Sequence, residues 1–98
     1  MEKELTLKEI RADLREIRYY YSRLSVFKAA EKDIGSSETA DTVKMYNEAI
    51  RRAPLILYDV YNGLYVKNST QVGFAVEMGY TAEYLSKLHK QLFYKFIV

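Results

Sequence analysis

The chain has 98 residues, of which 49% are hydrophobic and 29% charged, a composition that indicates one small globular domain and excludes a disordered chain. It has no cysteine, which excludes a disulfide framework and thiolate metal ligands. The 15 basic and 13 acidic residues give a net charge of +2, and no segment forms a polybasic arm. No apolar run approaches the length of a membrane span, and the charged start "MEKELTLKEI" lacks the apolar core of a signal peptide. We therefore expect a soluble, cytoplasmic protein without membrane contact.

A long helix is predicted over residues 6–33, in a chain with one proline and four glycines. Thr6 and Glu9 fit a capping box at its start, and Gly35 fits its C-terminal stop. Apolar residues recur at alternating steps of three and four along one helix face: Leu7, Ile10, Leu14, Ile17, Tyr21 and Leu24. This heptad seam fits either another helix of the same chain or a second copy in a homodimer, and both interpretations stay open.

A helical segment broken near Pro54 is predicted over residues 38–67. Its first half keeps one helix face apolar through Val43, Tyr46, Ile50 and Ala53. Pro54 disfavours helical geometry at the residue before it and lacks a backbone donor, so a kink or break is expected there.

Residues 55–67, "LILYDVYNGLYVK", fit two structures. Asn62-Gly63 between β-prone residues is a strong hairpin signal. An isolated hairpin is only marginally stable, however, and the chain offers no third strand. Apolar residues also recur at helical spacing, so we favour a helix in which Gly63 costs about 1 kcal/mol.

A helix-turn-helix is predicted over residues 70–97. Thr70 fits the cap of a first helix that ends near Met78, and Thr81 fits the cap of a last helix. Ala75 permits close helix approach, and Gly79 permits the left-handed turn between the helices. Further apolar residues would fill the core between the helices: Phe74, Met78, Tyr80, Leu85 and Leu88. A generic helical hairpin with the same core face is the alternative. The predicted fold class is thus all-α.

The stretch "LYDVYNGLYVKNSTQVGFAVEMGYTAEYLSKLHKQLFYKF" resembles region 4 of sigma factors. It is more similar still to small phage transcription regulators of the ArpU and RinA type. In those proteins an apolar helix with a terminal aromatic pair precedes a Thr- or Ser-capped helix, a turn such as "LGYS" and a recognition helix. The resemblance covers about residues 54–98, and these residues carry it: Tyr65, Thr70, Ala75, Gly79, Tyr80, Thr81, Tyr84, Leu85 and Leu88.

The resemblance implies a sequence-specific regulator of transcription that binds double-stranded DNA and acts with RNA polymerase. Thr70 and Gln71 would lie at a helix N-terminus close to phosphate. Glu83 would accept a hydrogen bond from cytosine, Lys87 would reach guanine, and Lys90 would hold the backbone. The complete set expected to face the major groove is Thr81, Ala82, Glu83, Ser86, Lys87 and Lys90.

A protein-binding module on the same fold is the alternative function. It would be a phage-encoded inhibitor or modulator of a host protein, such as RNA polymerase or a defence factor. The near-neutral charge, the Val72-Gly73 pair and the lack of arginine after Arg52 favour it. His89 is the single histidine and is expected on the surface or beside phosphate. It has no second imidazole for a metal site, and the glycines form no phosphate loop, so we expect no enzyme, metal or cofactor.

Overall fold

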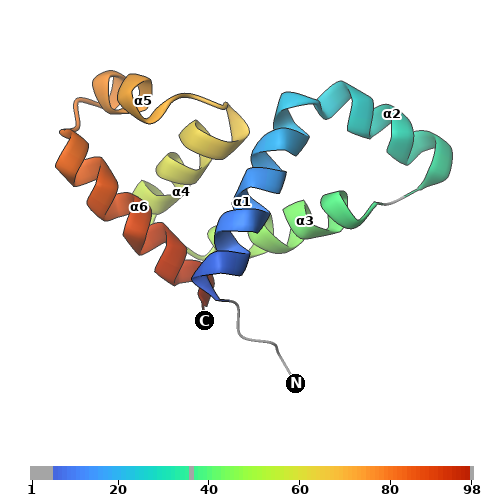
Figure 1. Ribbon diagram of the computed structural model, residues 1–98, viewed down its shortest axis with the longest axis horizontal. Helices are drawn as coiled ribbons and strands as arrows, with labels where there is room; N and C mark the ends of the chain where they lie inside the picture. Colours follow the sequence, from blue (N-terminus) through green and yellow to red (C-terminus); the bar gives the residue numbers. More distant parts are fainter. Residues whose placement is uncertain (1–5, 36, 98) are drawn as a thin grey trace.

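The computed structural model describes residues 6–35 and 37–97, which form helices joined by short turns, with no β-strand in these ranges (Figure 1). The all-α prediction is therefore confirmed. In chain order the elements are α1 (Leu7–Ser22), α2 (Leu24–Ile34), α3 (Glu38–Ile50), α4 (Leu55–Tyr61), a π-helical turn η1 (Asn62–Val66), α5 (Gln71–Met78) and α6 (Ala82–Ile97). None of the helices described is long and apolar enough to cross a bilayer.

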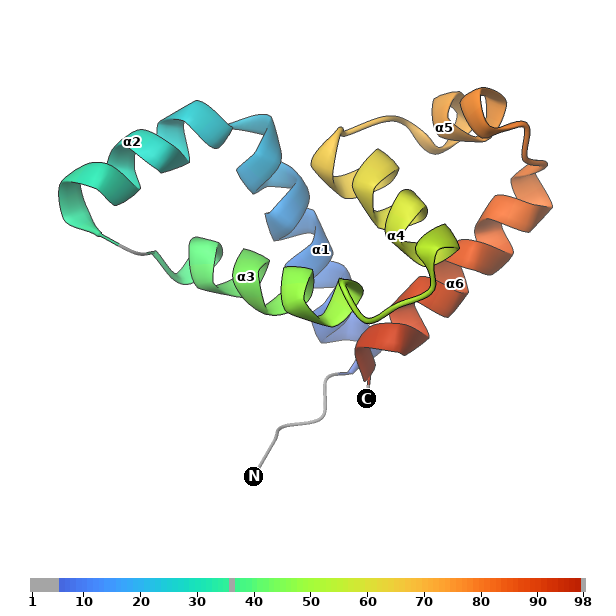
Figure 2. The same cartoon turned by 180° about the vertical axis from the view of Figure 1, so that it is seen from behind.

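Helix α1 lies at the centre of the molecule, between α2 and α3 on one side and α4, α5 and α6 on the other (Figures 1 and 2). It packs against α3, η1 and α6. Ile10, Leu14 and Ile17 of the predicted seam are at most 1% exposed. The seam thus packs within the chain. These three side chains are buried there and cannot form the homodimer contact that was the other interpretation.

The prediction of one helix over residues 6–33 is wrong at Arg23. The backbone leaves helical geometry there, with φ −123° and ψ 34°, and α2 begins at Leu24. The bend brings Phe27 against the ring of Tyr20, with the ring centroids 5.0 Å apart. Tyr20 is consequently buried, Tyr21 is only half-buried, and Leu24 is exposed. Packing between buried Tyr20 and half-buried Phe27 at this corner outweighs the helical continuity that the sequence favours.

The predicted break near Pro54 is confirmed. α3 ends at Ile50, Pro54 takes extended geometry with φ −55° and ψ 146°, and α4 begins at Leu55. Residues 55–67 are helical, so the helix interpretation of this segment is confirmed over the hairpin. The segment ends in a π turn, in which the Lys67 amide donates to the Asn62 carbonyl at 2.8 Å.

Gly63 lies inside this π turn, packed against the next helix. A methyl group built on its Cα would overlap the Cδ1 and Cε1 atoms of the Phe74 ring. The glycine thus lets α5 approach η1 closely, which explains why the segment accepts the cost of a glycine in a helix.

The core is rich in tyrosine, and the hydroxyl groups of Tyr46 and Tyr61 have hydrogen-bond partners. Tyr46, which is 1% exposed, donates to Asp13 Oδ2 at 2.6 Å. Tyr61 donates to Asn47 Oδ1 at 3.0 Å. Burial raises the pKa of both phenols far above the ordinary value of 10.0, so both remain donors at any physiological pH.

Candidate nucleic-acid interface

The turn between α5 and α6 has the local geometry predicted from the sequence. Thr70 Oγ1 accepts the Gly73 amide at 3.0 Å and caps α5. Gly79 is left-handed, with φ 72° and ψ 27°. Thr81 Oγ1 accepts the Tyr84 amide at 3.0 Å at the start of α6. Each cap satisfies a helix-end donor, so the start of α6 is fixed by its own sequence.

The apolar anchors of these two helices are buried, with one exception. Phe74, Ala75, Leu85 and Leu88 are all at most 7% exposed. Met78, predicted as a core residue, is instead 37% exposed at the last position of α5. Tyr80 is half-buried and packs against the core, with its ring centroid 6.2 Å from that of Phe74 and 5.0 Å from that of Tyr84.

The N-terminal half of α6 presents most of the residues predicted to contact DNA on one open face. A shallow hollow of 460 Å³ is lined by Ala82, Glu83, Ser86, Lys87 and Lys90, and all five are exposed. Thr81 is exposed directly before α6, and Thr70 and Gln71 are exposed at the start of α5. The structure thus brings five of the eight predicted residues into one hollow and places the other three at helix starts.

Helix α1 separates its charges onto two flanks. One flank carries basic residues at steps of three, four and three: Lys8, Arg11, Arg15 and Arg18. The other flank faces α3, where Asp13 accepts from Tyr46 and Glu16 Oε1 accepts the Thr39 hydroxyl at 2.7 Å. The basic flank is not visible in the net charge of the chain, because these cations and the neighbouring acids cancel. The helical spacing of the basic residues was the signal that would have found it.

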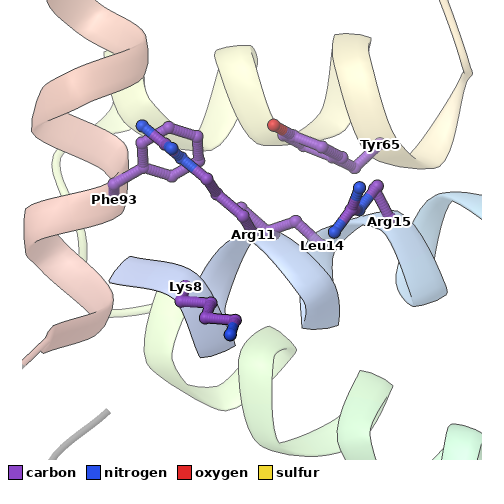
Figure 3. Close-up of a pocket in the computed structure, with 6 residues that line it drawn as sticks. All are labelled: Lys8, Arg11, Leu14, Arg15, Tyr65 and Phe93. Atoms are coloured by element: carbon purple, nitrogen blue, oxygen red, sulfur yellow. The ribbon is translucent and has the colours of Figure 1, made fainter. Parts of the chain in front are cut away.

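A cleft of 510 Å³ lies where this basic flank meets η1 and α6, and it is lined by Lys8, Arg11, Leu14, Arg15, Tyr65 and Phe93. Arg11 extends from α1 towards Phe93 on α6, Arg15 lies beside Tyr65, and Lys8 turns away (Figure 3). The Arg11 guanidinium carbon is 5.7 Å from the centroid of the Phe93 ring, within the range of a cation–π contact. At the far end of the flank, Arg18 Nε donates to Asn68 Oδ1 at 2.9 Å and ties α1 to the turn before α5.

His89 packs against Tyr65 and Phe93, two residues that line this cleft. Its predicted position on the surface is therefore wrong, whereas the alternative position beside phosphate stays a prediction. His89 is half-buried, its Nε2 shares a hydrogen bond with the Tyr65 hydroxyl, and its ring centroid is 4.6 Å from that of Phe93. Burial, together with the charge of Arg11, lowers the pKa of His89 below its ordinary 6.5. Burial raises the pKa of Tyr65 to about 12, with Arg18 acting in the opposite direction. Both groups are therefore neutral at pH 7, and the cleft takes its positive charge from α1 alone.

The cleft and the hollow adjoin along α6. Lys90 lines the hollow, and Phe93, three residues later, lines the cleft. Residues three apart are surface neighbours on a helix. The two features therefore lie next to each other on α6, and each is lined by basic side chains.

Other kinds of site have less support. Within residues 6–35 and 37–97, no three histidine, aspartate or glutamate side chains come together as metal ligands. No protein-family model, curated protein or solved structure matches the chain. The similarity to sigma region 4 and to phage regulators therefore stays a prediction.

Proposed function

We propose that the protein is a DNA-binding regulator of transcription, in which α5 and α6 act as a helix-turn-helix and α6 is the recognition helix. The observation that carries the proposal is the exposed polar face of α6, which sits over the buried anchors Leu85 and Leu88. A helix with its side chains is about 10–12 Å across and fits a major groove about 12 Å wide.

The residues of this face offer the chemistry that reads bases. The Lys87 ammonium donates to guanine O6 and N7, and the Glu83 carboxylate accepts from the cytosine amino group. Ala82 and the Thr81 methyl offer apolar contact to a thymine methyl. Lys90, one turn further along α6, holds phosphate.

The start of α5 supplies a second contact with the backbone. α5 begins at Gln71, directly after the cap Thr70, and both residues are exposed. Free amides and the positive end of the helix dipole favour an anion at such a position. This contact would fix the orientation of α6 in the groove without reading sequence.

The test is fluorescence anisotropy with labelled duplexes, first a random-sequence pool across a range of salt and then a site selected from that pool. Lys87→Ala should weaken binding to the selected site by about 1–3 kcal/mol, roughly 5- to 150-fold, and relax the preference for one base pair. The control is Lys95→Ala, which removes the same charge from an exposed position in the last turn of α6. Full-strength binding by Lys87→Ala would refute the role of α6.

A second candidate function is the binding of another protein, and the surface of α5 favours it. Val72 and Val76 lie one turn apart and are 77% and 76% exposed. Apolar residues that repeat on an exposed helix face are typical of protein contacts. If no duplex binds even at low salt, this function replaces the first, with RNA polymerase as the first partner to test. Clear DNA binding beside an empty pull-down with RNA polymerase would refute it.

A further inference from the structure

We infer that the cleft between α1 and α6 binds a backbone phosphate of the same duplex, with Arg11 and Arg15 as its ligands. This inference rests on the proposed insertion of α6 into the major groove. It adds a second element, distant in sequence, to the DNA-binding surface. It also assigns a role to the basic flank of α1, whose side chains are not needed for the core.

The charge of the cleft favours an anion. Lys8, Arg11 and Arg15 line it, and among the residues that the structure describes no carboxylate does. Two acids of α1, Asp13 and Glu16, are held on its other flank by Tyr46 and Thr39. No ion pair within residues 6–35 and 37–97 involves either cleft arginine; the pair recorded there joins Arg51 to Glu48 on an exposed surface. The positive charge of the cleft is therefore not neutralised from within the described chain.

The side chains also suit a phosphate by shape. A guanidinium is a planar fork whose N–H groups match two phosphate oxygens at once. Contact with the Phe93 ring restricts Arg11 while its N–H groups remain free to donate. Arg15 stands one helical turn from Arg11 on the same flank, beside Tyr65 (Figure 3). Arg11, restricted in this way, loses less side-chain entropy on binding than a free surface arginine would.

The position of the cleft makes the ligand a strand of the duplex. A helix about 10–12 Å across fills a groove about 12 Å wide, so groups that stand beside the helix meet the sugar–phosphate wall. The cleft stands beside α6 in this way, because Phe93 lines it and Lys90, three residues earlier, lines the recognition hollow. A strand that passes Lys90 thus continues into the cleft.

The test is the salt dependence of DNA binding by Arg15→Gln and by the double variant Arg11→Gln/Arg15→Gln. The slope of log K against log salt falls by about 0.9 for each phosphate contact removed. We expect a decrease of about 1 for the single variant and about 2 for the double variant. The decrease should be equal on the selected site and on random duplex, so that the ratio of the two affinities stays unchanged. The matched control is Lys32→Gln, which removes one charge from the exposed end of α2, away from α6 (Figure 1).

The outcomes separate this inference from the proposed function. If the wild type binds DNA and the slope of Arg15→Gln equals that of the control, the cleft does not hold phosphate and the inference is overturned while α6 keeps its role. If the wild type binds no duplex, both are overturned. Circular dichroism and thermal unfolding check that the variants fold. If the double variant does not fold, the slope of Arg15→Gln alone tests the inference. This single variant keeps Arg11 and its contact with the Phe93 ring.

Discussion

Replacement of Gly63 by alanine tests how closely α5 is packed against η1. The new methyl group would overlap the Phe74 ring, which is 4% exposed and lies against Tyr80, so any shift of the ring disturbs the residues packed around it. Overpacking of this kind costs about 1–3 kcal/mol. Alanine in place of glycine regains up to about 1 kcal/mol of helix propensity. The expected net loss is about 1–2 kcal/mol, or about 5–15 °C in Tm for a domain of this size.

A double-mutant cycle isolates the overlap from every other effect of the substitution. Phe74→Leu removes the ring, so Gly63→Ala in that background should cost nothing or stabilise by up to about 1 kcal/mol. The assay is urea unfolding of the wild type, the two single variants and the double variant, monitored by circular dichroism. An equal cost in both backgrounds, or a stabilised single variant, would refute the close packing of η1 and α5 at this position.

Two further predictions concern the titratable groups of the core. Between pH 7.5 and pH 5 the wild type should lose more stability in urea unfolding than His89→Gln. Burial and the charge of Arg11 lower the pKa of His89 in the folded protein. As the pH falls, the unfolded chain therefore takes up the proton first, and the folded state loses stability relative to it. Equal losses would contradict this. Tyr46→Phe should cost about 1–2 kcal/mol because half-buried Asp13 loses its phenol donor, whereas the control Tyr94→Phe, at a side chain 60% exposed, should stay within about 0.5 kcal/mol in the same assay.

The features that the sequence predicted well are those determined by neighbouring residues. The caps at Thr6, Thr70 and Thr81 each accept an amide three residues ahead, as their positions before apolar helices indicate. Gly79 ends α5 because a left-handed residue is needed there. Pro54 marks the break between α3 and α4 by its own covalent geometry.

The features that the sequence did not predict depend on distant contacts. The break at Arg23 has no glycine or proline to signal it and follows from the packing of Phe27 on Tyr20. The burial of His89 depends on its contact with Tyr65, which is distant in sequence. The π turn adds one residue to a helical turn, and no pattern in the sequence marks where it forms. Five residues of the candidate site could be grouped in advance because they share one helix, whereas the cleft joins residues from three segments.

Helix α2 differs from the rest of the fold in having no buried residue. A helix held by so little apolar contact opens locally at a small fraction of the free energy of global unfolding. We therefore expect native-state hydrogen exchange to separate residues 24–34, with fast amides, from the centre of α1, whose amides require global opening. Gly35 ends α2 at an exposed left-handed position with open space around its Cα. This corner is thus the preferred place to cut the chain, attach a spectroscopic label or insert a second domain while α6 and the cleft keep their shape.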